Sequence, residues 1–197
     1  MRDLLQQPAA QIAPRLLGSV VTSRIGGHEV RLRLTEVEAY GGVDEDPGSH
    51  AFRRQTPRNA SMFGPAGHAY VYFTYGMHWC LNVVTSPEGQ ASAVLLRAGQ
   101  ILNGVPVARR RRGESVTERD LARGPARLAN SLGVTKDLDG VDLLDGSGPL
   151  SLLLADGPIL AHASGPRTGV RGEGSVTPWR FFLEDEPTVS RYRRASP

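Results

Sequence analysis

Hydrophobic and polar residues alternate over residues 28–34, which predicts a β-strand with one buried face. The apolar side chains share one face of this strand: Val30, Leu32 and Leu34. If the alternation continues, the same face next carries two carboxylates and a phenol: Glu36, Glu38 and Tyr40. A carboxylate in a core is costly unless it is paired or hydrogen-bonded, and such groups often belong to functional sites. The alternative is that the strand leaves the core after Leu34 and both glutamates are solvated.

Several other segments have the apolar or alternating pattern of strands. Gly26 and Gly27 predict a hairpin that joins strands 19–25 and 28–40. Further strands are predicted at 69–75, 79–85 and 92–98, and shorter ones near 150–155, 158–163 and 179–184. The long segment 41–68 is rich in glycine, proline and charge, which is typical of a functional or mobile loop.

Two regions have helical patterns. Residues 9–17 predict a short helix, and residues 101–135 predict an interrupted one that ends at Gly133. The arginines at 109–112 form a charged surface stretch within it. Since no proline-rich or serine-rich linker divides the sequence, we expect one α+β domain over residues 1–197. Its core should be a curved, mainly antiparallel β-sheet with flanking helices.

The composition is that of an ordinary globular protein, with 40% apolar and 22% charged residues in a chain of 197. No apolar run approaches the roughly 18 residues of a membrane helix, and the N-terminus lacks the pattern of a signal peptide. A single cysteine, Cys80, excludes an internal disulfide and a multi-cysteine zinc site. These features predict a cytoplasmic protein that does not act at a membrane.

The basic residues are almost all arginines, since Lys136 is the single lysine among 23 lysines and arginines. A codon bias could explain the skew, and phosphate binding by the planar guanidinium group is the functional alternative. In either case the chain has almost no lysine for Schiff-base chemistry.

The segment AYVYFTYGMHW, residues 69–79, combines aromatic side chains with a turn. Tyr70 and Tyr72 share one face of the predicted strand, and Phe73 and Tyr75 share the other. Gly76 predicts a turn that projects Tyr75 outward. An exposed aromatic ring near the arginines of FRRQTPRN, residues 52–59, suits stacking on nucleic acid or wedging into it.

Two polar residues interrupt apolar strands, Asn82 in WCLNVV and Arg97 in SAVLLRA. Each could be a core polar group with satisfied hydrogen bonds. Together with Glu38, they predict a shared polar pocket on the sheet.

The elements TEVEAY, HAFRRQTPRNASMFGPAGHAYVYFTYGMHWCLNVV and AVLLRA, in this order, closely resemble the alkyladenine DNA glycosylase family, also called methylpurine or 3-methyladenine DNA glycosylases. The resemblance is dense over residues 34–98 and continues more thinly through ARGPARLANSLGV and PWRFF. It implies a monofunctional DNA glycosylase of base excision repair. Such an enzyme flips a damaged purine out of duplex DNA and hydrolyses its N-glycosidic bond, and its lesions include 3-methyladenine, 7-methylguanine, hypoxanthine and ethenoadenine.

The resemblance also implies roles for individual residues. Glu38 matches the glutamate that deprotonates the attacking water, and Arg97 matches the arginine that helps to hold that water. The flipped base would lie in a pocket formed by Tyr40, His50, Tyr72 and Asn82, the last of which would exclude normal guanine. Tyr75 would fill the gap in the duplex, and the remaining DNA contacts would be Arg54, Thr56, Met77, His78 and Arg127. No cofactor and no metal are implied, and the expected partner is double-stranded DNA bound by a monomer at the nucleoid.

Two other functions are compatible with parts of the sequence. A nucleic-acid-binding module without catalysis would keep the arginines and Tyr75 but would not need Glu38. A carboxylate–metal nuclease would use Glu36 and Glu38, but the sequence offers no clear third ligand.

Overall fold

A long antiparallel hairpin forms the centre of the fold in the computed structural model, which describes residues 1–195. Its strands are β1 (Val20–Ile25) and β2 (His28–Tyr40), joined by a two-residue turn. Gly26 and Gly27 have φ angles of 64° and 73°, the left-handed values that a type I′ turn requires. The predicted hairpin is therefore confirmed.

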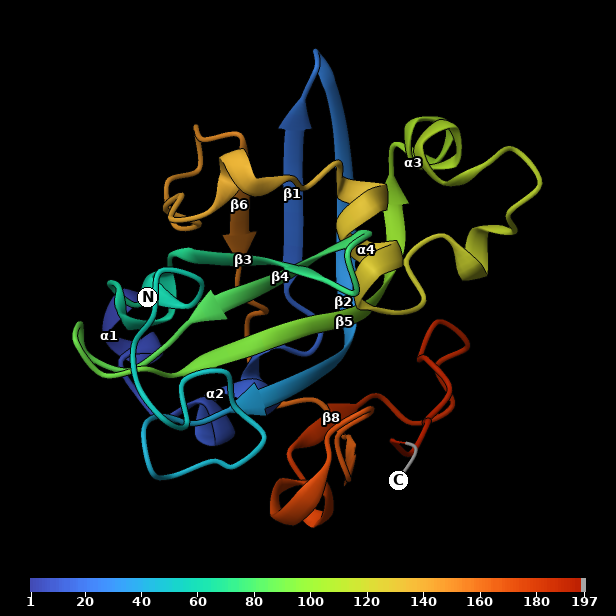
Figure 1. The fold of residues 1–197 in the computed structure, drawn as a ribbon. Coiled ribbons are helices and arrows are strands. Elements are labelled where there is room, and N and C mark those ends of the chain that lie inside the picture. Colours follow the sequence, from blue (N-terminus) through green and yellow to red (C-terminus); the bar gives the residue numbers. More distant parts are fainter. Residues whose placement is uncertain (196–197) are drawn as a thin grey trace.

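The strands form one strongly curled sheet in the order β3-β4-β5-β2-β1-β6, in which all neighbours are antiparallel (Figure 1). β8 pairs with the second half of β2 and with β7. The remaining strands are β3 (Ala69–Thr74), β4 (His78–Val84), β5 (Ala93–Asn103), β6 (Leu150–Leu153), β7 (Ala163–Gly165) and β8 (Arg180–Phe182). The predicted α+β class with a curved antiparallel sheet is confirmed.

An irregularity in the middle of β2 exchanges the two faces of the strand. The register with β5 shifts between Leu34 and Glu36 and again between Glu36 and Val37. Past this bulge, Val37 and Ala39 pack in the main apolar core, although the alternation from residue 30 assigns that face to the glutamates. The predicted face for Glu36, Glu38 and Tyr40 is therefore wrong. The predicted burial of both carboxylates is confirmed, since each is 0% exposed.

Four α-helices flank the sheet: α1 (Arg2–Leu5), α2 (Ala9–Leu16), α3 (Val105–Arg112) and α4 (Pro125–Leu132). Apolar side chains of α2 and α4 belong to the same core cluster as those of the sheet, and α2 packs on β2 while α4 packs on β4 and β5. The 3-10 helices in the loops are η1 (Ala60–Phe63), η2 (Glu118–Asp120), η3 (Lys136–Leu138) and η4 (Gly172–Val176). Within residues 1–195, no helix has both the length and the apolar character needed to cross a membrane.

Two predicted boundaries are wrong. Residues 101–103 extend β5 instead of starting a helix, because Ile101 and Asn103 pair with β2. The strand expected at 158–163 begins only at Ala163, where β8 provides a partner for three residues. Both corrections arise from pairing between segments distant in the sequence, which local periodicity does not record.

Candidate active site

A cavity of about 440 Å³ opens on the polar face of the sheet, within the size range of small-molecule sites. Tyr70 and Tyr72 face it from β3, while Val71 between them packs in the main core, as the alternation predicts. Six of the lining side chains come from β2, β3, β4, β5 and the 41–68 loop: Tyr40, His50, Tyr70, Tyr72, Asn82 and Arg97. The predicted polar pocket is thus present, and its residues come together from distant parts of the chain.

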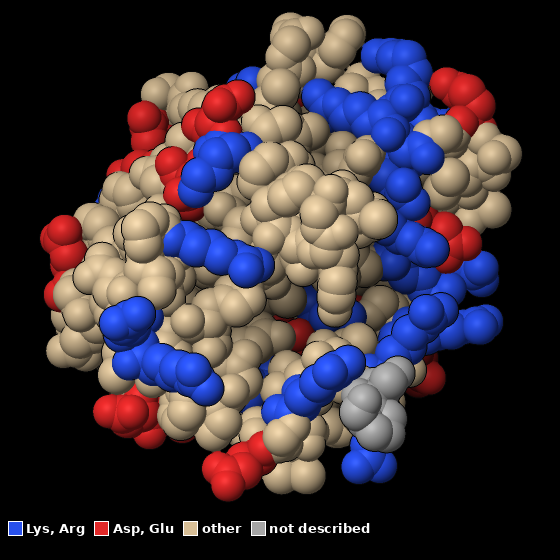
Figure 2. Space-filling view, viewed as in Figure 1, with Lys and Arg blue, Asp and Glu red and all other residues tan. Residues whose placement is uncertain are grey.

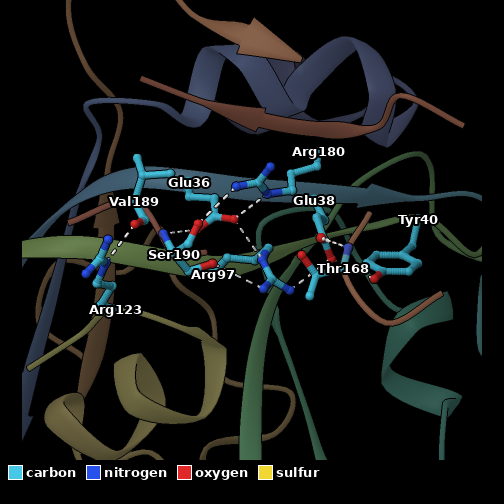
Figure 3. Close-up of polar contacts among 9 residues, drawn as sticks. All are labelled: Glu36, Glu38, Tyr40, Arg97, Arg123, Thr168, Arg180, Val189 and Ser190. Atoms are coloured by element: carbon cyan, nitrogen blue, oxygen red, sulfur yellow. Dashed lines mark hydrogen bonds and ion pairs between the residues drawn. The ribbon is translucent and has the colours of Figure 1, made fainter. Parts of the chain in front are cut away.

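Glu38 lies directly behind this cavity, and its hydrogen-bond donors are themselves cavity-lining residues. The Tyr40 hydroxyl donates to Oε2 over 2.8 Å, and Arg97 Nη1 donates to the same oxygen over 3.3 Å. The backbone N–H of Thr168 donates to Oε1 over 2.6 Å (Figure 3). Because a carboxylate offers about four acceptor positions, one remains for a further donor.

Glu36 is held in a different environment, on the side of the C-terminal segment (Figure 3). Oε1 accepts from Arg97 Nε (3.0 Å) and Arg180 Nε (2.6 Å), and Oε2 accepts from the Ser190 backbone N–H (2.8 Å). Burial raises the pKa of this carboxyl, but the charges of Arg97 and Arg180 outweigh it and hold the pKa below its usual value. Glu36 is therefore an ionised anchor for two arginines.

Arg97 connects the two carboxylates and is 5% exposed. Its third contact is Nη2 to the Ser190 hydroxyl, over 3.3 Å. Burial alone would lower the pKa of Arg97, but the charges of Glu38 and Glu36 raise it above its usual value. The guanidinium thus carries a fixed positive charge at the back of the cavity.

The aromatic walls stay neutral at physiological pH. Burial and the neighbouring Glu38 charge raise the pKa of Tyr40 well above its usual value, and burial does the same for Tyr72. The His50 ring meets the Tyr72 ring edge-on at 4.6 Å between centroids, and His50 Nδ1 lies 3.1 Å from the Tyr70 hydroxyl. Partial removal of the His50 ring from water and the charge of Arg58 lower the pKa of His50. The residue as a whole is still exposed to solvent.

The sequence left open whether Asn82 is a hydrogen-bonded core residue or a pocket residue, and in the structure it is both. It lines the cavity, and its Nδ2 also donates to the Tyr70 carbonyl over 2.9 Å. The amide is 3% exposed on a central strand, so it cannot swing away from a bound group.

Tyr75 stands at the tip of the β3–β4 hairpin, where it is 84% exposed and borders the cavity. Its φ of 51° is left-handed, which is uncommon for a non-glycine residue, and Gly76 follows with a φ of 66°. The predicted outward projection is confirmed. Met77 and His78 next to it are also exposed, and His78 lines the cavity.

Arg54 and Thr56 lie in a compact turn organised by Asn59, a buried residue that sequence reasoning missed. Asn59 Nδ2 donates to the carbonyls of His50 and Arg54, and its Oδ1 accepts from the Thr56 N–H over 2.6 Å. Arg54 is exposed and Thr56 is half-buried. Both are therefore fixed in place next to His50, although they do not line the cavity.

An arginine-lined groove of about 650 Å³ adjoins the cavity, and Arg97 and Thr168 line both. Its other arginines are Arg112, Arg119, Arg123, Arg127, Arg191 and Arg193. Figure 2 shows basic side chains gathered along this side of the molecule, near α3 and the C-terminal segment.

Lys136 lines neither hollow, and its Nζ pairs with Asp139 over 2.6 Å. In residues 1–195, no group of three histidine, cysteine, aspartate or glutamate side chains is placed to hold a metal ion. Glu36 and Glu38 are instead bound by arginines and backbone N–H groups.

Sequence reasoning missed the residues of the C-terminal third of the chain that hold Glu36 and Glu38: Thr168, Arg180 and Ser190. Thr168 and Ser190 lie outside helices and strands, and Arg180 lies on β8, a strand of three residues that is too short for periodicity to mark a buried side chain. The sequence contained one signal for these partners. Two buried carboxylates need more hydrogen-bond donors or positive charge than the single arginine on β5 provides.

Comparison with known proteins gives a family match over most of the chain. Residues 3–187 match the family model described as methylpurine-DNA glycosylase (MPG). A protein named "putative 3-methyladenine DNA glycosylase" from Streptomyces avermitilis is 50% identical over 100% of this chain and 92% of its own length. Proteins with the same name from Leifsonia xyli and Mycobacterium leprae (strain Br4923) are 51% and 44% identical, over 98% and 93% of this chain and 92% and 84% of their own.

Proposed function

This chain belongs to the methylpurine-DNA glycosylase family, which makes it a hydrolase of N-glycosidic bonds in DNA repair, and we propose that it excises damaged purines from duplex DNA after flipping them into the cavity. We further propose that it acts as a monomer on nucleoid DNA in the cytoplasm. The lesions would be alkylated purines such as 3-methyladenine and 7-methylguanine, together with hypoxanthine and ethenoadenine.

The observation that carries this proposal is the position of Glu38 relative to the cavity and to Tyr75. An aromatic-walled cavity suits a flat base, and a buried carboxylate lies directly behind it. An exposed tyrosine at the rim is placed to take the position of the extruded nucleotide in the stack. The cavity and the tyrosine suit base flipping, and the carboxylate suits hydrolysis of the bond to the flipped base.

In the proposed reaction, Glu38 accepts a proton from the attacking water through its remaining acceptor position. Arg97, which donates to Glu38 Oε2, helps to hold that water. The water oxygen bonds to C1′ of the sugar while the C1′–N bond to the base breaks, and the base leaves with the bonding electrons. A base alkylated at N3 or N7 is cationic, so it leaves as a neutral molecule. Lys136 does not line the cavity and its amine is paired with Asp139, which favours water over a lysine amine as nucleophile.

The pocket walls suit a cationic purine. The neutral rings of Tyr40 and Tyr72 can attract such a base by cation–π interaction. The lowered pKa of His50 keeps its ring uncharged near pH 7, which avoids repulsion of the base. Asn82 would meet the exocyclic amino group of guanine, a group that adenine and hypoxanthine lack at that position.

The duplex would lie across the cavity mouth and the arginine-lined groove. Arg54, Thr56 and Arg127, the last of which lines that groove, would contact phosphates, while Met77 and His78 would extend the wedge around Tyr75. Since phosphate contacts position DNA without reading its sequence, this arrangement suits a search for damage at any sequence.

A base-release assay tests the proposal. Duplexes that contain 3-methyladenine, 7-methylguanine, ethenoadenine or hypoxanthine are incubated with excess protein, and the free base and the abasic site are quantified. We expect release from at least the cationic lesions. Tight binding without release from any duplex would instead favour a non-catalytic nucleic-acid-binding module.

A further inference from the structure

Arg167 is a nearly completely buried arginine, 1% exposed, at the contact between the 41–50 loop and the segment 167–176. Its two terminal nitrogens grip Asp46 in a bidentate pair, over 2.5 and 2.6 Å. They also donate to the carbonyls of Ala39 (2.9 Å) and Gly174 (3.2 Å). One guanidinium thus ties β2, the 41–50 loop and η4 together.

The 41–50 loop and the segment 167–176 pack so closely that only glycine fits at two positions. A Cβ added at Gly48 would lie 2.6 Å from Arg167 Nη2, and one added at Gly174 would lie 2.7 Å from the Gly48 nitrogen. Asp46 in turn accepts from the backbone N–H groups of Gly41 (3.0 Å) and Gly48 (2.9 Å). The loop that presents His50 to the cavity therefore closes around the Arg167–Asp46 pair.

Arg167 is next to a donor for each oxygen of Glu38. Its Cζ lies 4.7 Å from the centroid of the Tyr40 ring, and the Tyr40 hydroxyl donates to Glu38 Oε2. The residue that follows Arg167 is Thr168, whose backbone N–H donates to Glu38 Oε1. Arg167 lies outside the cavity lining, whereas Tyr40 and Thr168 are part of it.

We propose that Arg167, held by Asp46, is a positioning residue for excision: it fixes the Thr168 N–H and the Tyr40 ring so that Glu38 faces the attacking water. The proposal rests on the role of Glu38 in the proposed function. The pair touches neither base nor water, so it acts only through these neighbours. Because a misplacement of about 1 Å at a reacting group can cost roughly a hundredfold in rate, a small relaxation here has a large effect.

The alternative is that the pair only stabilises the fold, as a buried ion pair can when one partner is already present. A stabilising role changes the fraction of folded molecules, whereas a positioning role changes the rate of each folded molecule. Single-turnover excision with saturating protein measures the second quantity, and it does so independently of DNA affinity.

The test compares Arg167→Lys with Arg2→Lys. Lysine keeps the charge and the aliphatic stem but loses the two-pronged grip on Asp46. Arg2 is a matched control, because its Nη2 pairs with Asp142 over 2.6 Å and joins two distant segments away from the cavity. Circular dichroism sets a temperature at which each protein is folded.

We expect Arg167→Lys to lower the single-turnover excision rate by about 10- to 100-fold, with affinity for abasic-analogue DNA changed by less than about threefold. Arg2→Lys should lower the melting temperature and leave the excision rate unchanged. The loss from Arg167→Lys should also be smaller in a Tyr40→Phe background, because part of the effect passes through the Tyr40–Glu38 hydrogen bond.

A folded Arg167→Lys protein that excises at the wild-type rate overturns the proposal, and so does a loss that is fully additive with Tyr40→Phe. If Arg167→Lys does not fold, Asp46→Asn is judged by the same rates, since it removes the charge that holds Arg167. A wild-type protein that releases no damaged purine refutes the proposed function instead, before any variant is compared.

Discussion

At the scale of single residues, the two glutamates of β2 differ in their neighbours and not in their burial. Glu36 is surrounded by Arg97, Arg180 and the Ser190 N–H, whereas every donor to Glu38 also lines the cavity. The sequence gives them the same parity and cannot separate them. The structure does so through the contacts of the C-terminal segment.

Replacing Glu38 by glutamine should abolish base release while leaving binding to abasic-analogue DNA largely intact. Glutamine keeps the shape of the side chain but cannot accept the proton of the water, so single-turnover excision should fall by roughly 10²- to 10⁴-fold. A loss of less than about tenfold would show that Glu38 is not the base.

Glu36→Gln is not a silent control for that experiment, because Glu36 accepts from Arg97 Nε and so helps to orient the guanidinium. Glu29→Gln is the better control. Glu29 lies on the same strand and pairs with Arg24 at the exposed end of the hairpin.

Asn82→Ala should raise the excision of undamaged guanine relative to hypoxanthine. The wild-type amide donates to the Tyr70 carbonyl and lines the cavity, where under the proposed function it would meet the guanine amino group. The guanine-to-hypoxanthine ratio and the melting temperature are measured together. If the variant is destabilised and the ratio is unchanged, Asn82 only hydrogen-bonds the backbone of the sheet and does not select the base.

At the scale of elements, hairpin geometry was predictable and strand irregularity was not. Gly26-Gly27 and Gly76 mark their turns in the sequence, and both turns have the expected left-handed backbone. The bulge in β2 has no such mark, since Thr35 and Glu36 are ordinary strand residues. Its effect is to let one strand supply core side chains to one face and, past residue 35, carboxylates to the other.

Tyr75→Ala should weaken flipping by roughly 1–3 kcal/mol, because it removes the ring that we propose takes the place of the extruded nucleotide. The effect should shrink when the target base is in a mismatch, where less stacking must be broken. Excision from paired and mismatched duplexes is compared. Phe73→Ala, on the same hairpin and packed on Trp79, controls for damage to the hairpin itself. Equal losses for Tyr75→Ala on both substrates would exclude the intercalating role.

The contribution of Asp46 to the free energy of unfolding should depend on pH, because it requires the Asp46 carboxylate to be charged. Burial raises the pKa of Asp46, but hydrogen bonds from Arg167 and the Arg167 charge outweigh it and hold the pKa below the unfolded value of 3.8. The stabilisation is therefore complete well above pH 3.8 and is lost as the pH falls through the lowered folded pKa. Asp46→Asn should reduce the free energy of unfolding by about 3–5 kcal/mol at pH 7.

The difference between wild type and Asp46→Asn should narrow as the pH falls below about 4, as measured by urea unfolding at a series of pH values. Asp156→Asn, an exposed position, is the control and should show no such change. A difference that is the same at neutral and acidic pH would contradict the assignment.

At the scale of the whole molecule, the net charge of +3 conceals an uneven distribution, with arginines gathered in one groove next to the cavity (Figure 2). Arg127→Gln should weaken binding to all duplexes alike and reduce the slope of log affinity against log salt by about 1, for one lost phosphate contact. Arg15→Gln on α2 is the control, since Arg15 is exposed far from the groove. An unchanged slope for Arg127→Gln would remove Arg127 from the DNA interface.

The sequence predicted the fold class, the central hairpin, the aromatic face of β3 and the position of Tyr75 from local patterns. It could not predict which segment covers Glu36 or what holds the 41–50 loop. Those contacts join residues 121 to 154 positions apart, through side chains in segments without periodicity. Buried carboxylates need paired charges or hydrogen-bond donors, so partners were expected, but the sequence did not show which residues they are.

The distance along the chain between the carboxylates of β2 and their partners also orders events during synthesis on the ribosome. Arg97 follows Glu36 by 61 positions, Arg180 by 144 and Ser190 by 154. At roughly 5–20 residues per second, Glu36 is made about 8–30 s before Ser190 exists. Until Arg97 is made, about 3–12 s after Glu36 at the same rate, the nascent hairpin carries a carboxylate that must stay hydrated, and the contacts with Arg180 and Ser190 form later still. The polar contacts of Glu36 can therefore be completed only once Ser190 has been made.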